Sequence, residues 1–230
     1  MQSMLHRLSK RLTAYAAAAR TRVATAIRGG ECIWQDLSVD ERRRLWPAAR
    51  DLEDRHVRNC RLLPNRYVLL EHMPKAAVCA EIGILECLYS DEIIRATQPA
   101  KLHLIDINPW WTNGARERFK SEIVDGRVIV HQGDSATILS SMPDRYFDWV
   151  YLDGDHTYEG AKRDLEATLP KMKARGLIAC DDYTFFGASD FAKYGVMEAV
   201  HEFCVRHDFE FVWLALQGRG YHDVVLRHVE

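Results

Sequence analysis

The stretch FDWVYLDGDHTYEGAKRDLEATLPKMKARGLIACDDY, residues 147–183, decides the fold of this chain. It begins with an apolar run over residues 147–152 that is typical of a buried strand, and the acidic loop Asp153-Gly154-Asp155-His156 follows. A helical pattern over residues 158–173 leads to a second apolar run, residues 176–180, which ends in Asp181-Asp182. A strand, a helix and a second strand in this order predict two parallel neighbours in one sheet.

The same alternation extends on both sides of this stretch, from residue 77 to the end of the chain. Upstream, the pattern predicts strands over 77–84, 101–107 and 127–132, and helices over 90–97, 113–123 and 136–140, the first of them capped by Ser90. Downstream, a helix over 190–207 precedes two strands over 209–216 and 222–228. Because no helix separates these two strands, we expect the last one to run antiparallel. The sequence therefore predicts an α/β fold, a doubly wound and mostly parallel seven-stranded sheet with an N-terminal helical extension.

The N-terminal region differs from this domain in its charge. Residues 1–30 contain six basic residues and no acidic one, and the other 200 residues hold 25 basic and 33 acidic residues. Apolar residues recur every three or four positions over 1–28, which predicts an amphipathic helix. We therefore divide the chain into a basic helical arm (1–30), a helical cap on the substrate side (31–75) and a cofactor-binding domain (76–230).

We expect the arm to pack on the domain or to join copies of the chain in a homo-oligomer. Two alternatives remain for residues 1–28. A basic amphipathic helix also suits the surface of an anionic membrane, and a cleaved transit peptide is likewise rich in arginine and free of acids.

Composition argues against several classes of protein. A hydrophobic content of 47% supports a sizeable core and argues against disorder. No apolar run approaches the ~18 residues of a membrane span, and the start lacks the apolar core of a secretory signal. The acidic domain argues against nucleic acid as a partner. Six cysteines without a CxxC pair indicate reduced, mostly buried thiols in a cytoplasmic protein.

Nearly every predicted strand ends in a carboxylate. In open α/β sheets, ligands bind at the carboxyl ends of the strands. The residues at these ends, in chain order, are Glu81-Ile82-Gly83, Asp106, Gly133-Asp134-Ser135, Asp153-Gly154-Asp155-His156 and Asp181-Asp182. Like charges at one edge repel one another, so we expect a cationic cofactor, a metal ion or both to relieve the repulsion.

Individual residues at these ends have more than one interpretation. Gly83 is typical of a tight turn against a ligand, and Asp106 stands at the distance beyond it that suits a carboxylate holding ribose hydroxyls. Asp106 and Asp134 are equally typical of helix caps. The acids after the fourth and fifth strands of the domain have the hard oxygen ligands that suit Mg²⁺, and solvated loop acids are the alternative.

The order of these motifs resembles that of class I S-adenosylmethionine (SAM)-dependent methyltransferases. Within that superfamily it resembles the metal-dependent sugar O-methyltransferases of antibiotic biosynthesis, which act on macrolide and aminocoumarin sugars. The resemblance covers about residues 65–230 and is most specific over 147–183. One position departs from the pattern, because Cys87 stands where the family's cofactor loop usually has a second glycine.

The resemblance implies a role for each strand-end residue. It implies that SAM contacts Glu81, Gly83, Asp106, Asp134, Ser135 and Asp153. It also implies that Asp153, Asp181 and Asp182 hold a divalent metal ion, Mg²⁺, and that Asp155 or His156 is the general base, with Asp155 preferred.

The implied activity is SAM-dependent methylation of a hydroxyl group on a sugar or a glycosylated small molecule. A catechol acceptor and an inactive binding module with the same fold are the alternatives. A Rossmann-type oxidoreductase is disfavoured because the complete Gly-x-Gly-x-x-Gly pattern is absent. We expect residues 183–186 to line the acceptor pocket, and Trp110 and Trp111 to form either a lid over the cofactor or part of the core.

Overall fold

The computed structural model describes residues 27–28, 31–32, 38–40, 49–187 and 192–229. The helix predicted over residues 1–28 lies outside the described residues, except for its last two positions. These two positions form the short strand β1 (Ile27–Arg28), which pairs with β2 (Glu31–Cys32).

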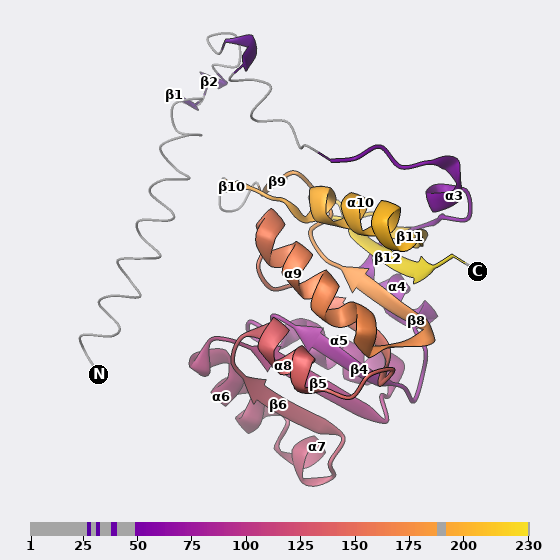
Figure 1. Cartoon of the computed structure of the whole chain (residues 1–230). Coiled ribbons are helices and arrows are strands. Elements are labelled where there is room, and N and C mark those ends of the chain that lie inside the picture. The colour runs from indigo at the N-terminus through magenta and orange to yellow at the C-terminus, as the bar shows by residue number, and fades with distance from the viewer. Residues whose placement is uncertain (1–26, 29–30, 33–37, 41–48, 188–191, 230) are drawn as a thin grey trace.

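An eight-stranded sheet forms the centre of the structure (Figure 1). Its strands are β3 (Arg61–Leu63), β4 (Val78–Ile82), β5 (Lys101–Asp106), β6 (Val128–Gln132), β7 (Phe147–Leu152), β8 (Met172–Cys180), β11 (Phe209–Ala215) and β12 (Asp223–His228). The strand order is β3-β11-β12-β8-β7-β4-β5-β6. Only β12 runs antiparallel to its neighbours, as predicted for the last strand, and all other pairs are parallel.

The sheet has one strand more than the seven that were predicted. The extra strand is β3, which pairs in parallel with the end of β11, where Arg61 lies opposite Trp213. It comes from the segment that was expected to form a helical cap, and three residues are too few for a period-two pattern to be recognised.

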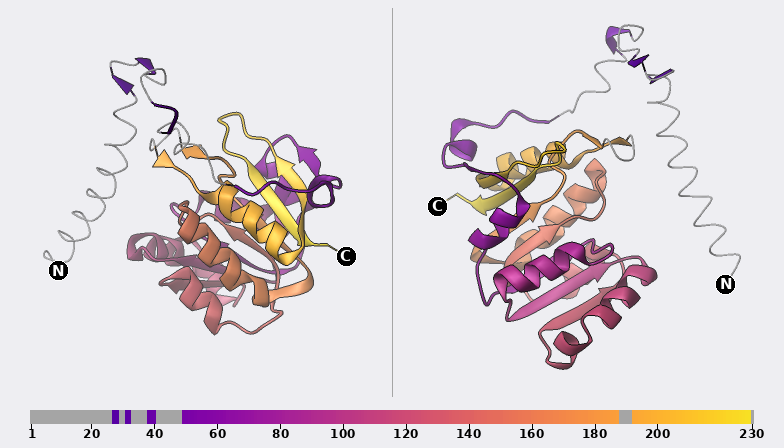
Figure 2. Two further views of the ribbon diagram at one scale, coloured as in Figure 1. Left: turned by 45° about the horizontal axis from the view of Figure 1, so that its top comes forward. Right: turned by 180° about the vertical axis from the view of Figure 1, so that it is seen from behind.

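Helices cover both faces of the sheet (Figure 2). One face carries α4 (Arg66–His72), α5 (Leu88–Thr97), α6 (Pro109–Arg118) and α7 (Lys120–Val124), and the other carries α8 (Ser135–Ser141), α9 (Tyr158–Thr168) and α10 (Val196–His207). The short helix α3 (Asp54–Val57) precedes β3. Alternate residues of β7 enter opposite cores: Trp149 and Tyr151 pack under α4 and α5, whereas Val150 and Leu152 pack under α9 and α10. The doubly wound α/β architecture is therefore confirmed.

Two helices begin earlier than predicted. The helix α5 starts at Leu88, and Cys87 rather than Ser90 occupies its N-cap position. The Ser90 hydroxyl donates instead to the buried carboxyl of Glu81, so the prediction that Ser90 caps this helix was wrong. The helix α6 starts at Pro109, because the Asn108 side chain accepts a hydrogen bond from the backbone N–H of Trp110 at 3.0 Å.

Two predicted helices extend over residues that form other structures. The helix predicted over 158–173 ends at Thr168, since a 3-10 turn over Leu169–Lys171 contains Pro170 and leads directly into β8. The helix predicted over 190–207 starts only at Val196, and the short strands β9 (Phe186–Gly187) and β10 (Ala192–Lys193) pair before it. The helix predicted over 113–123 is interrupted at Phe119, between α6 and α7.

The described cysteines support the expectation of reduced, mostly buried thiols. Cys60, Cys79, Cys87, Cys180 and Cys204 are free, and all but Cys60 are buried. A search of the described residues found no helix with the length and apolarity that crossing a membrane requires.

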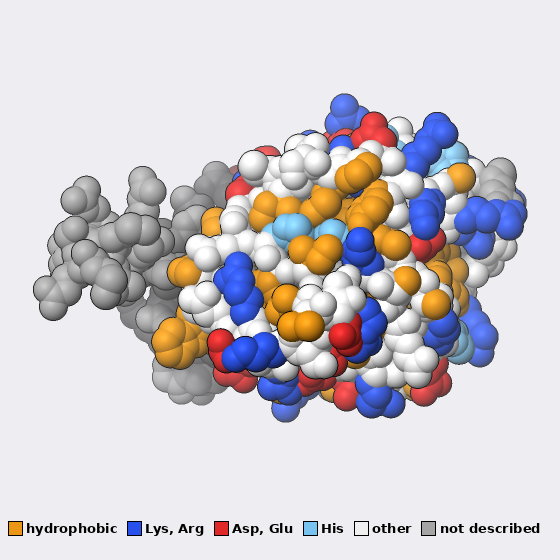
Figure 3. Space-filling model, turned by 90° about the horizontal axis from the view of Figure 1, so that it is seen from below, with side chains coloured by type: hydrophobic (Ala, Val, Ile, Leu, Met, Phe, Trp, Pro, Cys, Tyr) orange, Lys and Arg blue, Asp and Glu red, His pale blue; other side chains and the backbone are white. Residues whose placement is uncertain are grey.

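A histidine pair lies at the β6 edge of the sheet, outside the cavity wall. The rings of His103 on β5 and His131 on β6 stack with centroids 5.1 Å apart, and two of their nitrogens lie 2.9 Å apart. Burial and the neighbouring His131 lower the pKa of His103 to about 4. Figure 3 shows the molecule from below, where hydrophobic and histidine side chains gather at the centre and charges of both signs surround them.

Candidate active site

The carboxyl ends of the parallel strands meet at one edge of the sheet, where the loops after β4, β5, β6 and β7 surround a cavity of about 510 Å³. This volume is within the range of small-molecule sites. Seven residues proposed from the sequence line the cavity: Gly83, Asp106, Asp134, Ser135, Asp153, Asp155 and His156. The structure thus brings together side chains that lie up to about 70 residues apart in the sequence.

The turn after β4 requires a glycine. Gly83 has φ +82°, and a Cβ atom at this position would lie 1.9 Å from the backbone oxygen of Asp153. Its N–H donates to the carbonyl of Ile105 at 2.9 Å. The loops after β4 and β7 therefore pack directly against each other, and only a residue without a side chain fits between them.

Asp106 ties two of the loops together. Its Oδ2 accepts a hydrogen bond from the backbone N–H of Ile84 at 3.0 Å, and its Oδ1 accepts one from Asn108 at 2.7 Å. A carboxylate has about four acceptor positions, so this side chain retains capacity to accept hydrogen bonds from a ligand in the cavity.

Asp134 and Ser135 begin α8. Asp134 caps the helix by accepting from the backbone N–H of Thr137 at 2.9 Å, and hydrogen bonds from the Thr137 side chain and backbone lower the pKa of Asp134. The Ser135 hydroxyl donates to Asp164 on α9. Asp164 is buried, and burial raises the pKa of its carboxyl. Asp134 therefore caps α8, as one interpretation of the sequence predicted, and it also lies on the cavity wall.

Glu81 lies apart from the cavity, although the resemblance placed it among the cofactor contacts. Its side chain is buried within β4 and accepts the hydrogen bond from Ser90. Burial raises the pKa of Glu81 to about 8, even though the Ser90 hydroxyl and the Arg66 charge act in the opposite direction. At neutral pH the carboxyl is therefore mostly protonated, which suits a position inside the core.

Cys87 adopts the backbone conformation of the glycine that it replaces. Its φ is +61°, in the left-handed region, which costs a residue with a side chain about 1 kcal/mol. The thiol packs in the core under α5 and is absent from the cavity wall. Burial raises the pKa of Cys87 to about 11, so the thiol stays protonated. The departure from the family pattern therefore leaves the cavity open.

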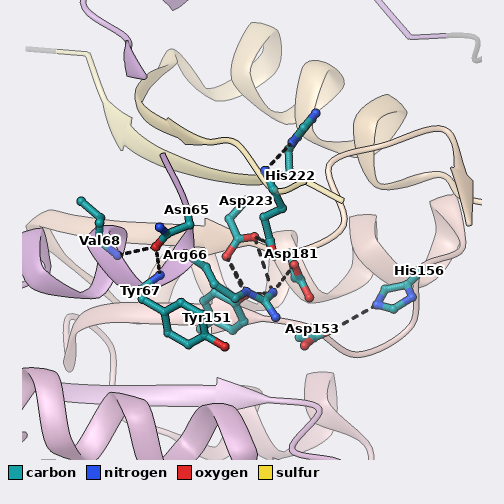
Figure 4. A network of polar contacts seen from close by, with 11 residues as sticks. Asn65, Arg66, Tyr67, Val68, Tyr151, Asp153, His156, Asp181, His222 and Asp223 are labelled. Atoms are coloured by element: carbon teal, nitrogen blue, oxygen red, sulfur yellow. Dashed lines mark hydrogen bonds and ion pairs between the residues drawn. The ribbon is translucent and has the colours of Figure 1, made fainter. Parts of the chain in front are cut away.

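His156 lies between two of the strand-end acids, and Figure 4 shows its contact with one of them, Asp153. The imidazole Nε2 is 3.2 Å from Asp153 Oδ1, and its Nδ1 is 3.4 Å from Asp182 Oδ2. Burial lowers the pKa of His156, but the hydrogen bond and charge of Asp153 and the charge of Asp182 outweigh it and raise the value to about 8. The Tyr194 ring packs beside the imidazole, with centroids 4.7 Å apart.

Arg66, the first residue of α4, reaches the same region from the other side (Figure 4). Its guanidinium forms ion pairs with Asp181 and with Asp223, whose Oδ2 is 3.3 Å from Nε. It also donates to the Tyr151 hydroxyl, which in turn donates to Asp223 at 2.8 Å. Burial alone would raise the pKa of Asp181, but the Arg66 charge lowers it.

Asp155 is exposed and is engaged by the local turn. Its Oδ1 accepts a hydrogen bond from the backbone N–H of Thr157 at 3.0 Å. Thr157 in turn caps α9 by accepting from Gly160. A Cβ atom on Gly160 would lie 2.3 Å from the Asp155 carboxyl carbon. Asp155 therefore has a clear structural role at the start of α9, although it also borders the cavity.

The three acids predicted to hold a metal face cationic side chains instead. Mg²⁺ and Ca²⁺ require several oxygen ligands at roughly 2.0–2.6 Å around one point. Here Asp181 pairs with Arg66, and Asp153 and Asp182 both face His156. Over the described ranges, no group of three or more His, Cys, Asp or Glu side chains is arranged to hold a metal ion. This arrangement does not fit a metal ion, and metal binding stays a prediction from the sequence.

Sequence reasoning missed several residues of this region. Arg66 and Asp223 belong to no motif, and Asn108, Arg163 and Asp164 on the cavity wall were not selected. A signal existed for Asp223. It begins the strand that was predicted to be antiparallel, so it had to lie at the same edge as the carboxyl ends of β7 and β8. No local signal pointed to Arg66, because its partners lie 85 and 157 residues away.

Two expectations about aromatic residues can be compared with the structure. Tyr183 was expected to line the acceptor pocket, but its ring packs edge-on against Phe211 in the core and its hydroxyl meets His201. Of the two tryptophans, Trp111 lines the cavity and also packs against the core, whereas Trp110 is 75% exposed. Both interpretations of Trp111 therefore hold in part.

Comparisons with known proteins agree with this fold. Residues 81–183 match a protein family described as Methyltransferase domain. A SAM-dependent methyltransferase from Aquifex aeolicus superposes with a TM-score of 0.55 at 14% identity, over 71% of this chain and 88% of that chain. The B. subtilis tRNA methyltransferase TrmK gives 0.54 at 14% identity, over 73% and 67%. The methyltransferase CalH in complex with SAH gives 0.55 at 13% identity, over 71% and 55%. No curated protein matches the chain.

The cavity wall combines three features that could contact a ligand. It combines the close backbone approach at Gly83, a carboxylate with free acceptor positions at Asp106 and the start of α8 at Asp134 and Ser135. Residues 81–183 therefore match a methyltransferase domain, and the chain has the Rossmann-like fold of the methyltransferases named above.

Proposed function

We propose that the protein transfers the methyl group of SAM to a hydroxyl oxygen of a sugar or of a glycosylated small molecule. The position of His156 carries this proposal, because its imidazole lies on the wall of the 510 Å³ cavity and is held by two carboxylates. SAM supplies an activated methyl group, so the chain must align an acceptor oxygen with it and take up the hydroxyl proton.

The cavity residues divide into two roles in this proposal. Gly83 lets the backbone approach the cofactor, Asp106 accepts hydrogen bonds from the ribose hydroxyls, and Asp134 and Ser135 contact the adenine side. The neutral form of His156 takes up the proton of the acceptor hydroxyl, so we expect the rate to rise as the pH passes the His156 pKa of about 8. A Mg²⁺ ion at the strand-end acids, which the resemblance implies, is left out of the proposal because Arg66 and His156 face those carboxylates.

The geometry favours His156 over Asp155 as the base. Asp155 is exposed and accepts a hydrogen bond at the start of α9, whereas His156 has Asp153 and Asp182 to hold its ring in one orientation. A base that is oriented by a carboxylate is the usual arrangement for proton transfer by histidine. This preference reverses the one that the sequence supported.

Two aromatic rings pack behind His156, and neither belongs to the cavity wall. The Tyr194 ring lies 4.7 Å from the His156 ring, and Tyr221 lies 6.5 Å from Tyr194, measured between centroids. Tyr194 is buried, so its ring supports the orientation of the imidazole.

The test is a methyl-transfer screen with labelled SAM over glycosides and catechols. We expect a glycoside to be methylated, and we expect His156→Asn to lower the rate by about 100-fold or more because the general base is lost. Asp155→Asn is the matched control and should retain most of the activity. Methylation of catechols alone would replace the acceptor class. SAM binding without transfer to any hydroxyl acceptor would favour the inactive binding module.

A further inference from the structure

Arg66 and Asp223 supplement the strand-end acids from outside the methyltransferase domain match. The match covers residues 81–183, so the acids Asp153, Asp181 and Asp182 lie inside it, whereas Arg66 and Asp223 lie outside. Arg66 comes from α4, and Asp223 begins the antiparallel strand β12. These two residues therefore add one cation and one anion that the matched domain does not contain.

Contacts of the neighbouring residues hold Arg66 in position. Asn65 caps α4 by accepting from the backbone N–H groups of Tyr67 at 2.9 Å and Val68 at 3.0 Å. The preceding strand β3 pairs with β11, which holds the start of α4 against the sheet. The guanidinium also lies over the Tyr89 ring, 4.6 Å from its centroid.

Asp223 is also held in position by its contacts. It is fully buried, and it accepts hydrogen bonds from Tyr151 at 2.8 Å and from the Gln217 side chain. Its strand neighbour Val224 lies opposite Cys180, which places Asp223 beside Asp181. The guanidinium of Arg66 thus bridges two buried carboxylates from adjacent strands.

We propose that the guanidinium of Arg66 takes the place of a divalent metal ion at the strand-end acids, so that this protein binds no Mg²⁺ or Mn²⁺ at Asp153, Asp181 and Asp182. Arg66 supplies a permanent positive charge there and forms an ion pair with the Asp181 carboxylate. The imidazole of His156 lies 3.2 Å from Asp153 and 3.4 Å from Asp182, so these two acids face a second cationic side chain. Methyl transfer rests on the proposed function, and in this proposal it proceeds without a divalent ion.

The first experiment measures Mn²⁺ binding to the full chain after treatment with EDTA, by calorimetry and by the Mn²⁺ signal in electron paramagnetic resonance. This measurement needs neither SAM nor an acceptor, so its outcome is independent of the proposed function. We expect no stoichiometric binding and no change in melting temperature with Mn²⁺, because a bound ligand would raise it. Stoichiometric binding that is lost in Asp181→Asn would overturn the proposal.

The second experiment removes the guanidinium. We expect folded Arg66→Met to gain Mn²⁺ binding, since Asp181 and Asp223 then lack a counter-charge, and we expect Arg66→Lys to gain none. Arg95→Met, which removes an exposed arginine paired with Glu92, is the control and should behave as the wild type. A folded Arg66→Met variant that binds no Mn²⁺ would contradict the replacement. If Arg66→Met does not fold, the wild-type measurement alone decides.

Discussion

The two halves of the strand-end edge differ in how they are filled. The loops after β4, β5 and β6 surround an open cavity and line it with Gly83, Asp106 and Ser135. The ends of β7 and β8 and the start of β12 are filled by the protein's own side chains, with Arg66 between Asp181 and Asp223. We call these the cofactor half and the acid half.

The two halves also differ in how far apart in the sequence their contacting residues lie. In the cofactor half, the side-chain contacts join residues three positions apart, as for Asp134 and Thr137, and residues 29 positions apart, as for Ser135 and Asp164. In the acid half, the contacts join residues that are far apart, as Arg66 is from Tyr151 and Asp223. The first half is open to a ligand, whereas the second is stabilised by charges within the chain.

The largest effect on stability is expected when the ion pairs of the acid half are removed. Arg66→Met should lower the free energy of unfolding by about 3–5 kcal/mol, because Asp181 and Asp223 remain buried without their counter-charge. Denaturation by urea measures the loss. The exposed pair of Arg95 and Glu92 provides the control, and Arg95→Met should cost less than about 1 kcal/mol. Equal losses for the two variants would show that the acid half does not depend on Arg66.

The next effect tests the contact between the two halves. Gly83→Ala should cost about 3 kcal/mol, since it combines a positive φ with a Cβ atom that collides with the Asp153 carbonyl. Gly126→Ala is a matched control, because Gly126 has φ +72° and open space around its Cβ position. It should cost only about 1 kcal/mol. Urea denaturation of both variants separates the collision from the backbone strain.

A third effect concerns how the stability of the core beneath the cofactor half depends on pH. The pKa of Glu81 is about 8 in the folded state and its ordinary value is 4.5, so the unfolded chain ionises first and stability falls as the pH rises toward 8. Between pH 6 and 8 the loss should be about 2 kcal/mol, and Glu81→Gln should remove it. Melting curves over this range provide the measurement. Glu117→Gln, at an exposed position, should keep the wild-type slope.

The smallest expected effect tests whether the cofactor half binds SAM through Asp106. Asp106→Asn should weaken SAM binding about tenfold, because a charged acceptor is lost from the cavity wall and from the loops that it ties together. Calorimetry with SAM measures the affinity. Asp125→Asn lies on an exposed turn away from the cavity and should leave the affinity unchanged. Unchanged affinity in Asp106→Asn would remove this residue from the cofactor site.

The sheet and the cofactor half were largely predictable from the sequence. Strands such as β7 have an apolar run of the expected length, and acids placed directly after parallel strands must share one edge of the sheet. The Gly83 turn and the Asp106 carboxylate followed from their positions in this pattern. The boundaries of α5 and α9 did not, because Cys87 and Pro170 change the backbone locally.

The acid half was only partly predictable. The sequence indicated that Asp153, Asp181 and Asp182 gather at the edge, but it did not reveal which cation lies among them. The partner Arg66 lies in a segment whose pattern is short and mixed, and its pairing with Asp181 exists only after β3 and α4 have packed on the sheet. Long-range ion pairs of this kind leave no periodic signal in one sequence.

The close packing of Gly83 on the Asp153 carbonyl connects the backbone of the cofactor half with that of the acid half. A ligand that shifts the turn after β4 must also move the backbone that carries Asp153, and through it the orientation of His156. Under the proposed function, we expect the affinities for cofactor and acceptor to be thermodynamically coupled, with each ligand altering the binding of the other by the same factor. The order in which the two ligands bind then leaves the total free energy of assembling the ternary complex unchanged.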